Sequence, residues 1–275
     1  MDKEFENMIN SLAEELDISL TDKQAEQFYK YMILLLEWNE KINLTTITKQ
    51  DDIILKHFID SLTILKYIKE KQKIIDVGTG AGFPGIPIAI MMPNVQITLL
   101  DSLNKRILFL QDVIQKLDLK NVRTIHGRAE EFARNMKERE SFDIAISRAV
   151  ANLSTLSEYL IPFVKMEGTC ICMKGPDIDE ELNDAKYAIN QLGGEVEKVQ
   201  NLSLPNSDMV RNIIMIKKKK TTPDRYPRKA GIPAKKPLSV RLNSRFPYNQ
   251  RLLRDYFLPV HCGTTRGTLE LKTLF

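Results

Sequence analysis

A glycine-rich turn that follows an acidic residue is the most chemically suggestive part of the sequence. Gly80, Gly82 and Gly85 have the spacing G-x-G-x-x-G, and Asp101 follows about twenty residues later. Such a strand-to-helix corner binds either pyrophosphates or adenosyl compounds, because glycine lets the backbone approach a ligand closely. Asp76, at the end of the preceding strand, would repel two phosphate charges at short range. The turn therefore favours S-adenosylmethionine, whose sulfonium and ammonium groups are cationic.

This interpretation assigns roles to the residues around the turn. Asp101 would accept hydrogen bonds from the two ribose hydroxyls, and Ala129 with Glu130 would lie at the adenine. Three structural alternatives stay open: a turn packed for its own sake, Asp101 as a helix cap, and Glu130 as a first-turn acid that suits the helix dipole. The residues expected to contact the cofactor are Asp76, Gly78, Gly80, Phe83, Asp101, Ala129 and Glu130.

The elements that must position these residues form an alternating series. From residue 73 the apolar runs KIIDV, VQITLLD, VRTIHG, FDIAIS and GTCICMKG alternate with helix-like segments. Two closing strands follow, at residues 195–202 and 210–217. Such alternation predicts an α/β fold with a mostly parallel seven-stranded sheet and helices on both faces. The expected helices span residues 84–91, 103–117, 129–137, 153–160 and 179–192.

The first 70 residues have a different texture. Apolar residues recur at helical spacing, and Thr21 with Gln24 forms a capping-box signature before the second helix. A further helix is expected over residues 51–68. We therefore predict an N-terminal helical lead-in, residues 1–70, ahead of the alternating domain.

Charge is unevenly distributed along the chain. Residues 217–254 contain thirteen Lys or Arg and one acid, Asp224, so they carry +12 while the remainder carries −8. This stretch, rich in Pro and Lys, is expected to be an extended and weakly folded tail. Its residues from Lys217 to Lys220, with Arg225, Arg228, Lys229, Lys235 and Lys236, could neutralise RNA phosphates, or it could be a solvated tail.

Several classes of protein are disfavoured. The acidic N-terminus has no secretory signature and no apolar run reaches the length of a spanning helix, so we expect a cytoplasmic protein. His57, His126 and His261 are isolated, and no metal site is expected. Cys170 and Cys172 share one face of a predicted strand and are expected to be free core thiols, with Cys262 left over.

The longer motifs resemble one family. DVGTGAGFPGIPIAI, LLDSLNKRILFL, HGRAEEF and SRAV, supported by EWNEKINLT and CMKGP, are similar to the glucose-inhibited division protein B family, the ribosomal small-subunit methyltransferase G group. The likeness covers residues 1–238. It implies a class I S-adenosylmethionine-dependent fold and methylation of guanine N7 in the 530-loop region of 16S ribosomal RNA. The family's cofactor positions fall on Gly78, Phe83, Ala129, Glu130 and Arg148.

The resemblance also implies an organisation and a partner. We expect the lead-in, a methyltransferase domain at residues 71–220, a C-terminal basic segment at residues 221–238, and an extension at 239–275 that does not match the family and has little structure. The expected partner is 16S ribosomal RNA or the small ribosomal subunit. The protein is expected to be a monomer without a metal or a membrane contact.

The motif after the fourth strand bears on the reaction. Enzymes of this fold that methylate exocyclic amines carry Asn or Asp, two Pro and an aromatic residue there, whereas this chain has SRAV from Ser147. Guanine N7 has a lone pair and no proton, so its methylation needs alignment rather than a general base. Arg148 and Lys174 are the expected catalytic residues, and Lys105, Lys174 and Arg211 the expected substrate-binding residues. An ion pair for Arg148, and solvated positions for Lys174 and Arg211, are the structural alternatives.

Other functions remain as rivals. A methyltransferase acting on a small molecule or on another RNA would share the cofactor corner. A nicotinamide-dependent oxidoreductase is disfavoured by Asp76 and by the lack of a Tyr-x-x-x-Lys or histidine-based hydride site. An RNA-binding module that kept the fold and lost its activity is the third rival.

Overall fold

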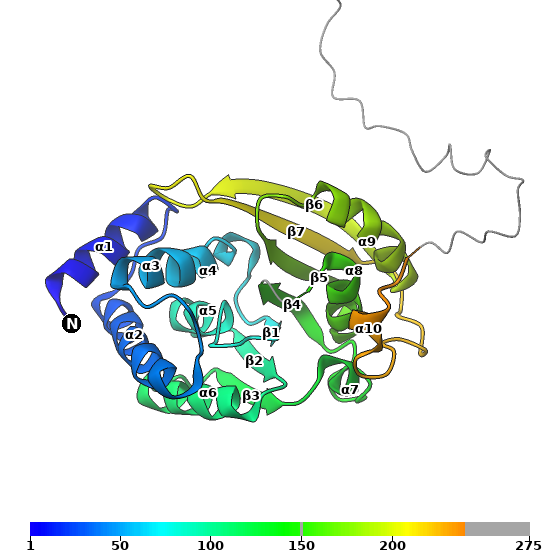
Figure 1. Ribbon diagram of the computed structural model, residues 1–275, viewed down its shortest axis with the longest axis horizontal. Coiled ribbons are helices and arrows are strands. Elements are labelled where there is room, and N and C mark those ends of the chain that lie inside the picture. Colours follow the sequence, from blue (N-terminus) through cyan, green and yellow to red (C-terminus); the bar gives the residue numbers. More distant parts are fainter. Residues whose placement is uncertain (149–150, 240–275) are drawn as a thin grey trace, which may run out of the picture. The chain divides into compact units, whose positions relative to one another are not determined.

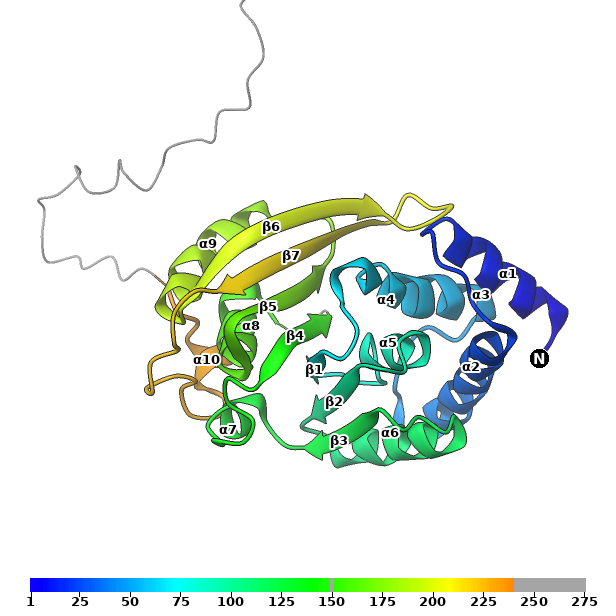
Figure 2. The same ribbon diagram turned by 180° about the vertical axis from the view of Figure 1, so that it is seen from behind.

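The computed structural model describes residues 1–148 and 151–239. Seven strands form one sheet in the order β3-β2-β1-β4-β5-β7-β6 (Figures 1 and 2). Five of them are parallel neighbours, while β7 runs antiparallel to both β5 and β6. The strands are β1 (Lys73–Val77), β2 (Gln96–Asp101), β3 (Val122–His126), β4 (Phe142–Arg148), β5 (Val164–Lys174), β6 (Gly194–Ser203) and β7 (Val210–Lys218).

The sheet confirms the predicted alternation. Its helices are α5 (Gly85–Met91), α6 (Asn104–Lys116), α7 (Ala129–Phe132), α8 (Leu153–Leu160), η3 (Ile161–Phe163), α9 (Asp179–Gln191) and α10 (Ile232–Lys235). Successive strand residues point to opposite faces, so Ile74 and Ile75 enter two separate cores. Cys170 and Cys172 are buried free thiols in the same core, as the spacing predicted.

The lead-in is helical, and its helices cover one face of the sheet. They are α1 (Lys3–Glu14), α2 (Asp22–Ile42), α3 (Gln50–Ile53), the π-helix η1 (Ile54–Ile59), α4 (Asp60–Leu62) and η2 (Leu65–Tyr67). Phe5 and Phe28 from this group share a core with the sheet residues Ile74 and Ile97. The capping box at Thr21 and Gln24 is confirmed. In Figure 1 these helices lie with α5 and α6, on the opposite side from α8 and α9.

One element of the lead-in departs from the prediction. The stretch expected to be a single helix over residues 51–68 is divided into α3, η1, α4 and η2. Single π-helical turns are rare and often occur at functional sites, because the wider turn displaces backbone groups and side chains from their usual register. Here the π-helix contains His57 and ends immediately before Asp60.

Candidate functional site

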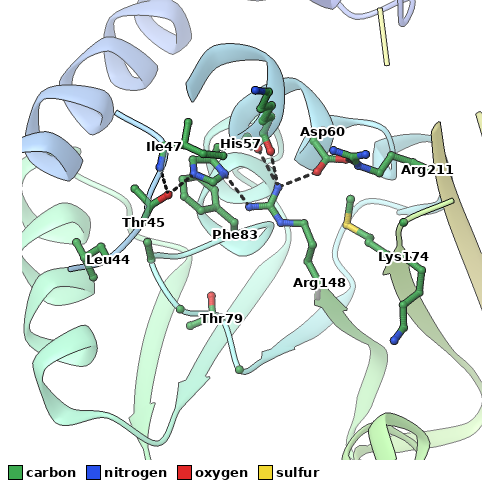
Figure 3. Close-up of a pocket in the computed structure, with 16 residues that line it drawn as sticks. Leu44, Thr45, Ile47, His57, Asp60, Thr79, Phe83, Arg148, Lys174 and Arg211 are labelled. Atoms are coloured by element: carbon green, nitrogen blue, oxygen red, sulfur yellow. Dashed lines mark hydrogen bonds and ion pairs between the residues drawn. The ribbon is translucent and has the colours of Figure 1, made fainter. Parts of the chain in front are cut away.

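A cavity of about 460 Å³ lies at the carboxyl ends of β1, β4 and β5. Strand order reverses between β1 and β4, and open α/β sheets bind ligands in the crevice at such a switch point. The lead-in supplies the opposite wall (Figure 3). The lining residues are Leu44, Thr45, Ile47, Lys56, His57, Asp60, Gly78, Thr79, Gly80, Ala81, Phe83, Arg148, Met173, Lys174, Gly175 and Arg211.

The glycine turn forms the floor of this cavity. Gly78 and Gly80 have φ values of 69° and 62°, in the left-handed region that favours glycine. A Cβ at Gly80 would meet no atom within 4 Å, whereas one at Gly82 would come within 2.7 Å of the Tyr31 hydroxyl. Gly82 is therefore required by packing, and the backbone at Gly80 is accessible to a ligand.

Asp76 is fully buried behind the turn and does not line the cavity. Its Oδ2 accepts hydrogen bonds from the Thr79 hydroxyl at 2.7 Å and the Gly85 amide at 2.9 Å. Its Oδ1 has no hydrogen-bond partner within the described residues. Burial raises the pKa of Asp76 to about 7, although both of these hydrogen bonds oppose the shift. A cation near the turn would favour the ionised form.

Arg148 ends β4 and is held on several sides. Its Nη1 donates to the Lys56 carbonyl at 3.1 Å and to Asp60 Oδ2 at 3.1 Å. Its Nη2 lies 3.2 Å from His57 Nδ1, and the guanidinium lies over the Phe83 ring, 5.0 Å from its centroid. The π-helix thus contributes both a carbonyl and a side chain to fixing one arginine.

The contact with Arg148 determines the state of His57. An arginine only donates, so Nδ1 must be the unprotonated acceptor and Nε2 must carry the proton, which points at Thr45 Oγ1 at 2.9 Å. The ring also stacks on Phe83 with centroids 4.5 Å apart. Burial, and then the charge of Arg148, lower the pKa of His57 to about 4. His57 is therefore neutral at physiological pH.

Asp60 connects two arginines that are far apart in the sequence. Its Oδ2 accepts from Arg148, and its Oδ1 accepts from Nε of Arg211, at the start of β7, at 3.1 Å (Figure 3). Asp60 is 3% exposed and is the only acid among the described residues that line the cavity. Sequence reasoning missed it. An acid inside the apolar stretch ILKHFIDSLTI was the available signal, because a buried carboxylate needs a partner.

The predicted site residues divide into two groups. The structure brings six of them together around the cavity: Gly78, Gly80, Phe83, Arg148, Lys174 and Arg211. Lys174, however, donates to Glu181 and to the Ala151 carbonyl, and Figure 3 shows its ammonium pointing away from Arg148. Lys105 is exposed on α6 and does not line the cavity. Ala149 and Val150 of the SRAV motif lie outside the described residues.

Besides Asp76, three predicted cofactor residues lie outside this cavity. Asp101 is buried and accepts from the Gly80 amide at 2.9 Å, from the Leu103 amide at 2.9 Å and from Arg106 at 3.3 Å. Ala129 and Glu130 begin α7, and Glu130 Oε1 accepts from the Gly231 amide at 2.8 Å. Asp101 thus contacts the turn directly, whereas Glu130 holds the C-terminal basic segment.

The C-terminal basic segment, residues 221–238, corrects one expectation. It contains turns, bends and the helix α10, and it is docked rather than loose, because Arg228 forms a bidentate pair with the fully buried Glu158. Just before it, Lys218 is 1% exposed and pairs with Glu140 at 2.7 Å. Arg228 and Lys218 are therefore committed to the fold and are not free to neutralise RNA phosphates. The extension at 240–275 lies outside the described residues.

The residues present fit S-adenosylmethionine. The carboxylate of Asp76 has an unpartnered oxygen behind a turn whose backbone is accessible at Gly80. Every cation that lines the described cavity is paired with an acid, Lys56 with Asp52, Lys174 with Glu181 and both arginines with Asp60, so these cations do not form the concentrated positive site that a diphosphate needs. Among the described residues no group of three His, Cys, Asp or Glu side chains could hold a metal ion. No helix in the same part of the chain is long and apolar enough to cross a bilayer.

The sheet, with its single reversed strand, and the cavity at its switch point define a class I S-adenosylmethionine-dependent methyltransferase. Residues 24–212 match the model of a family described as rRNA small subunit methyltransferase G. The chain is 51% identical over 239 residues to the protein of that name from Clostridium novyi, covering 86% of this chain and 98% of the relative. This chain therefore belongs to the rRNA small subunit methyltransferase G family.

A second relative carries the same name. The ribosomal RNA small subunit methyltransferase G of Alkaliphilus oremlandii is 51% identical over 237 residues, which is 86% of this chain and 99% of that protein. Among solved structures, the chain is similar to a SAM dependent methyltransferase from Aquifex aeolicus, with a TM-score of 0.47 and 18% identity. That match covers 61% of this chain and 94% of the other.

Proposed function

We propose that the protein transfers a methyl group from S-adenosylmethionine to N7 of a guanine in the 530-loop region of 16S ribosomal RNA, as a monomer in the cytoplasm. The names of its relatives support ribosomal RNA of the small subunit as the substrate. The family motifs in the sequence support N7 and the 530-loop region. The observation that supports N7 as the target atom is that no group among the described residues of the cavity is free to accept a proton.

The described part of the cavity offers no free general base. The lone pair of His57 faces Arg148, and its other nitrogen donates to Thr45. Both oxygens of Asp60 are paired with arginines. Methylation of an exocyclic amine requires loss of a proton, whereas guanine N7 has a lone pair in the plane of the ring and no proton to lose. The cavity therefore suits N7, and the rate enhancement comes from alignment.

Two charges are suited to holding the cofactor. Bound S-adenosylmethionine supplies an electrophilic methyl group on a positively charged sulfur. Asp76 would favour that charge and the ammonium group, and Arg148 would bind the carboxylate of the methionine moiety. The backbone at Gly78 and Gly80 would approach the ligand. Asp101 for the ribose, and Ala129 with Glu130 for the adenine, stay predictions.

The C-terminal basic segment would contact RNA through its exposed lysines. Its Gly231 amide is held by Glu130 and its Pro233 carbonyl by Thr155, at the starts of α7 and α8. These helices follow the carboxyl ends of β3 and β4, so this part of the segment lies at the same end of the strands as the cavity. Lys229, Lys235 and Lys236 are exposed and have no ion pair within the described residues, which leaves them free for phosphates.

Methyl transfer to defined RNA tests this function. Purified protein would be incubated with labelled S-adenosylmethionine and either naked 16S ribosomal RNA or small subunits from cells that lack the protein. Chemical cleavage at 7-methylguanine then maps the product to a nucleotide. The expected result is one site in the 530-loop region, and the Gly78→Val variant serves as the inactive control. Label on another base or at another ring position, or no label on RNA, would overturn the proposal.

A further inference from the structure

The Asp60 cluster, defined as His57, Asp60, Arg148 and Arg211, joins three separate parts of the chain. Asp60 begins α4, Arg148 ends β4 and Arg211 lies at the start of β7. The carboxylate is almost completely buried, and each of its oxygens takes a different arginine at 3.1 Å. Every member of the cluster lines the cavity. One acid thus fixes two cations that face the same ligand space.

The hydrogen bonds within the cluster leave donors available. Arg148 has five N–H donors, and the described contacts use its Nη1 and one hydrogen of its Nη2. Arg211 uses its Nε toward Asp60 and its Nη1 toward the Val210 carbonyl. Within the described residues, Arg148 keeps its Nε and one Nη2 hydrogen, and Arg211 keeps its Nη2. Both arginines are therefore oriented by the protein while retaining donors for a ligand.

The two arginines face different parts of the ligand space. Arg148 lies over Phe83, the residue that follows Gly82 in the glycine turn. Arg211 lies on the other side of Asp60 from Arg148 in Figure 3, away from the Phe83 ring. The glycine-turn side is the cofactor side of the site proposed above. The Arg211 side is left for the second substrate.

We infer that Asp60 is a positioning residue that holds Arg148 toward the cofactor and Arg211 toward the RNA, through one shared carboxylate. This inference rests on the proposed function. Asp60 does not act on the reacting atoms. It fixes the direction of both guanidinium groups and offsets their charge.

The charge balance explains why the shared acid matters for a cationic cofactor. Two guanidinium groups close to a sulfonium would repel it, because like charges repel strongly in a site of low dielectric. The negative charge of Asp60 offsets one of the two positive charges of the arginines. S-adenosylhomocysteine lacks the sulfonium charge but has the same adenosine and amino-acid parts. Loss of the Asp60 charge should therefore weaken the binding of S-adenosylmethionine more than the binding of its product, S-adenosylhomocysteine.

Calorimetric titration of Asp60→Asn tests the cofactor half of this inference. We expect the Kd for S-adenosylmethionine to rise about tenfold or more, because an arginine loses a charged hydrogen bond and the local charge becomes more positive. The Kd for S-adenosylhomocysteine should rise by a smaller factor, so that the ratio of the two constants changes. A role in folding alone would lower both affinities equally or leave both unchanged.

A double-mutant cycle tests the RNA half. Asp60→Asn and Arg211→Gln are each expected to raise the KM for the RNA substrate about tenfold. In the Arg211→Gln background, Asp60→Asn should raise it no further while still weakening S-adenosylmethionine. Arg211→Gln alone should leave the cofactor Kd unchanged. Full additivity of the two substitutions in the RNA KM would overturn the inference.

Glu140→Gln is the matched control. Glu140 pairs with the buried Lys218 at the opposite end of β7 and does not line the cavity. The Glu140→Gln substitution should lower the unfolding temperature. It should not change the RNA KM or the ratio of the Kd values for S-adenosylmethionine and S-adenosylhomocysteine. An Asp60→Asn protein that behaves like Glu140→Gln would refute the positioning role. A wild-type protein that binds neither cofactor would instead refute the proposed function.

Discussion

The two ends of strand β7 each carry a cation paired with a buried or half-buried acid, yet their surroundings differ. At one end Arg211 meets Asp60, and at the other Lys218 meets Glu140. All three donors of Lys218 are used, by Glu140 at 2.7 Å, Thr222 at 2.8 Å and the Ile161 carbonyl at 3.0 Å. Arg211 borders a cavity and keeps a donor free among the described contacts.

The difference separates a structural ion pair from a functional one. A cation whose every donor is used within the protein has nothing left to offer a ligand, so its pairing only stabilises the fold. A cation that is held by one acid but keeps donors toward open space is oriented for binding. The presence of an ion pair alone does not distinguish these cases, because both ends of β7 have a cation paired with an acid.

We call the Lys218 end of β7 the closed end, because all donors of Lys218 are used, and the Arg211 end the open end. The largest expected effect comes from breaking the ion pair at the closed end. Lys218→Met should lower the free energy of unfolding by about 3–5 kcal/mol, because it leaves Glu140 without its partner. Urea unfolding followed by circular dichroism measures the change. Calorimetric titration of the folded variant should give an unchanged Kd for S-adenosylmethionine. A tenfold weaker cofactor affinity in this variant would break the distinction between the two ends.

The open end of β7 lies next to a titratable group, His57, and the pH dependence of stability due to this histidine is the next largest effect. His57 has a pKa of about 4 in the folded protein and 6.5 as a reference, so between these values the unfolded chain binds a proton that the folded protein does not. Stability must therefore fall as the pH falls through this window. Between pH 7.5 and pH 5 the loss due to His57 should be about 2 kcal/mol.

A variant isolates this contribution. His57→Asn keeps an acceptor for Arg148 and removes the titration, so it should lose about 2 kcal/mol less than the wild-type protein over the same pH range. Urea unfolding at several pH values provides both curves. Parallel curves would show that His57 is not held neutral by the cluster.

Much of the fold could be predicted from the sequence because local signals agree with the final structure. Apolar runs of strand length, the glycine turn and the capping box at Thr21 each depend on neighbouring residues, and all three are confirmed. The helix predicted over residues 153–160 is α8. The predicted face shared by Cys170 and Cys172 is also confirmed, since strand alternation is a local rule.

The arrangement around Asp60 could not be predicted in the same way. It depends on contacts between residues 88 and 151 positions apart in the sequence, and on a π-helix that no local periodicity indicates. For the same reason Lys174 and Lys218 read alike in the sequence as cations at strand ends. Their partners, Glu181 and Glu140, become visible only in the structure.

Asp76 offers a smaller effect that concerns the open end alone. Its pKa of about 7 should fall when a cationic cofactor binds, so the affinity for S-adenosylmethionine should rise with pH. From pH 6 to pH 7.5 the gain should be about eightfold. His57, with its pKa of about 4, does not titrate in this range. Titration calorimetry at four pH values measures the slope, and Asp76→Asn should bind weakly with no slope. A slope that persists in Asp76→Asn would assign the effect to another group.

The smallest expected effect lies one residue beyond Lys218. Lys219 is 44% exposed at its side chain and pairs with Glu167, which is 62% exposed, at 3.2 Å. Water screens such a pair and both side chains lose rotamer freedom in forming it, so Lys219→Met should change the free energy of unfolding by less than about 1 kcal/mol. The same urea experiment that measures Lys218→Met gives this value. Two adjacent lysines with the same substitution then differ only in burial and in the saturation of their donors. Equal losses in the two variants would mean that the closed end of β7 is not the stabilising contact that its geometry indicates.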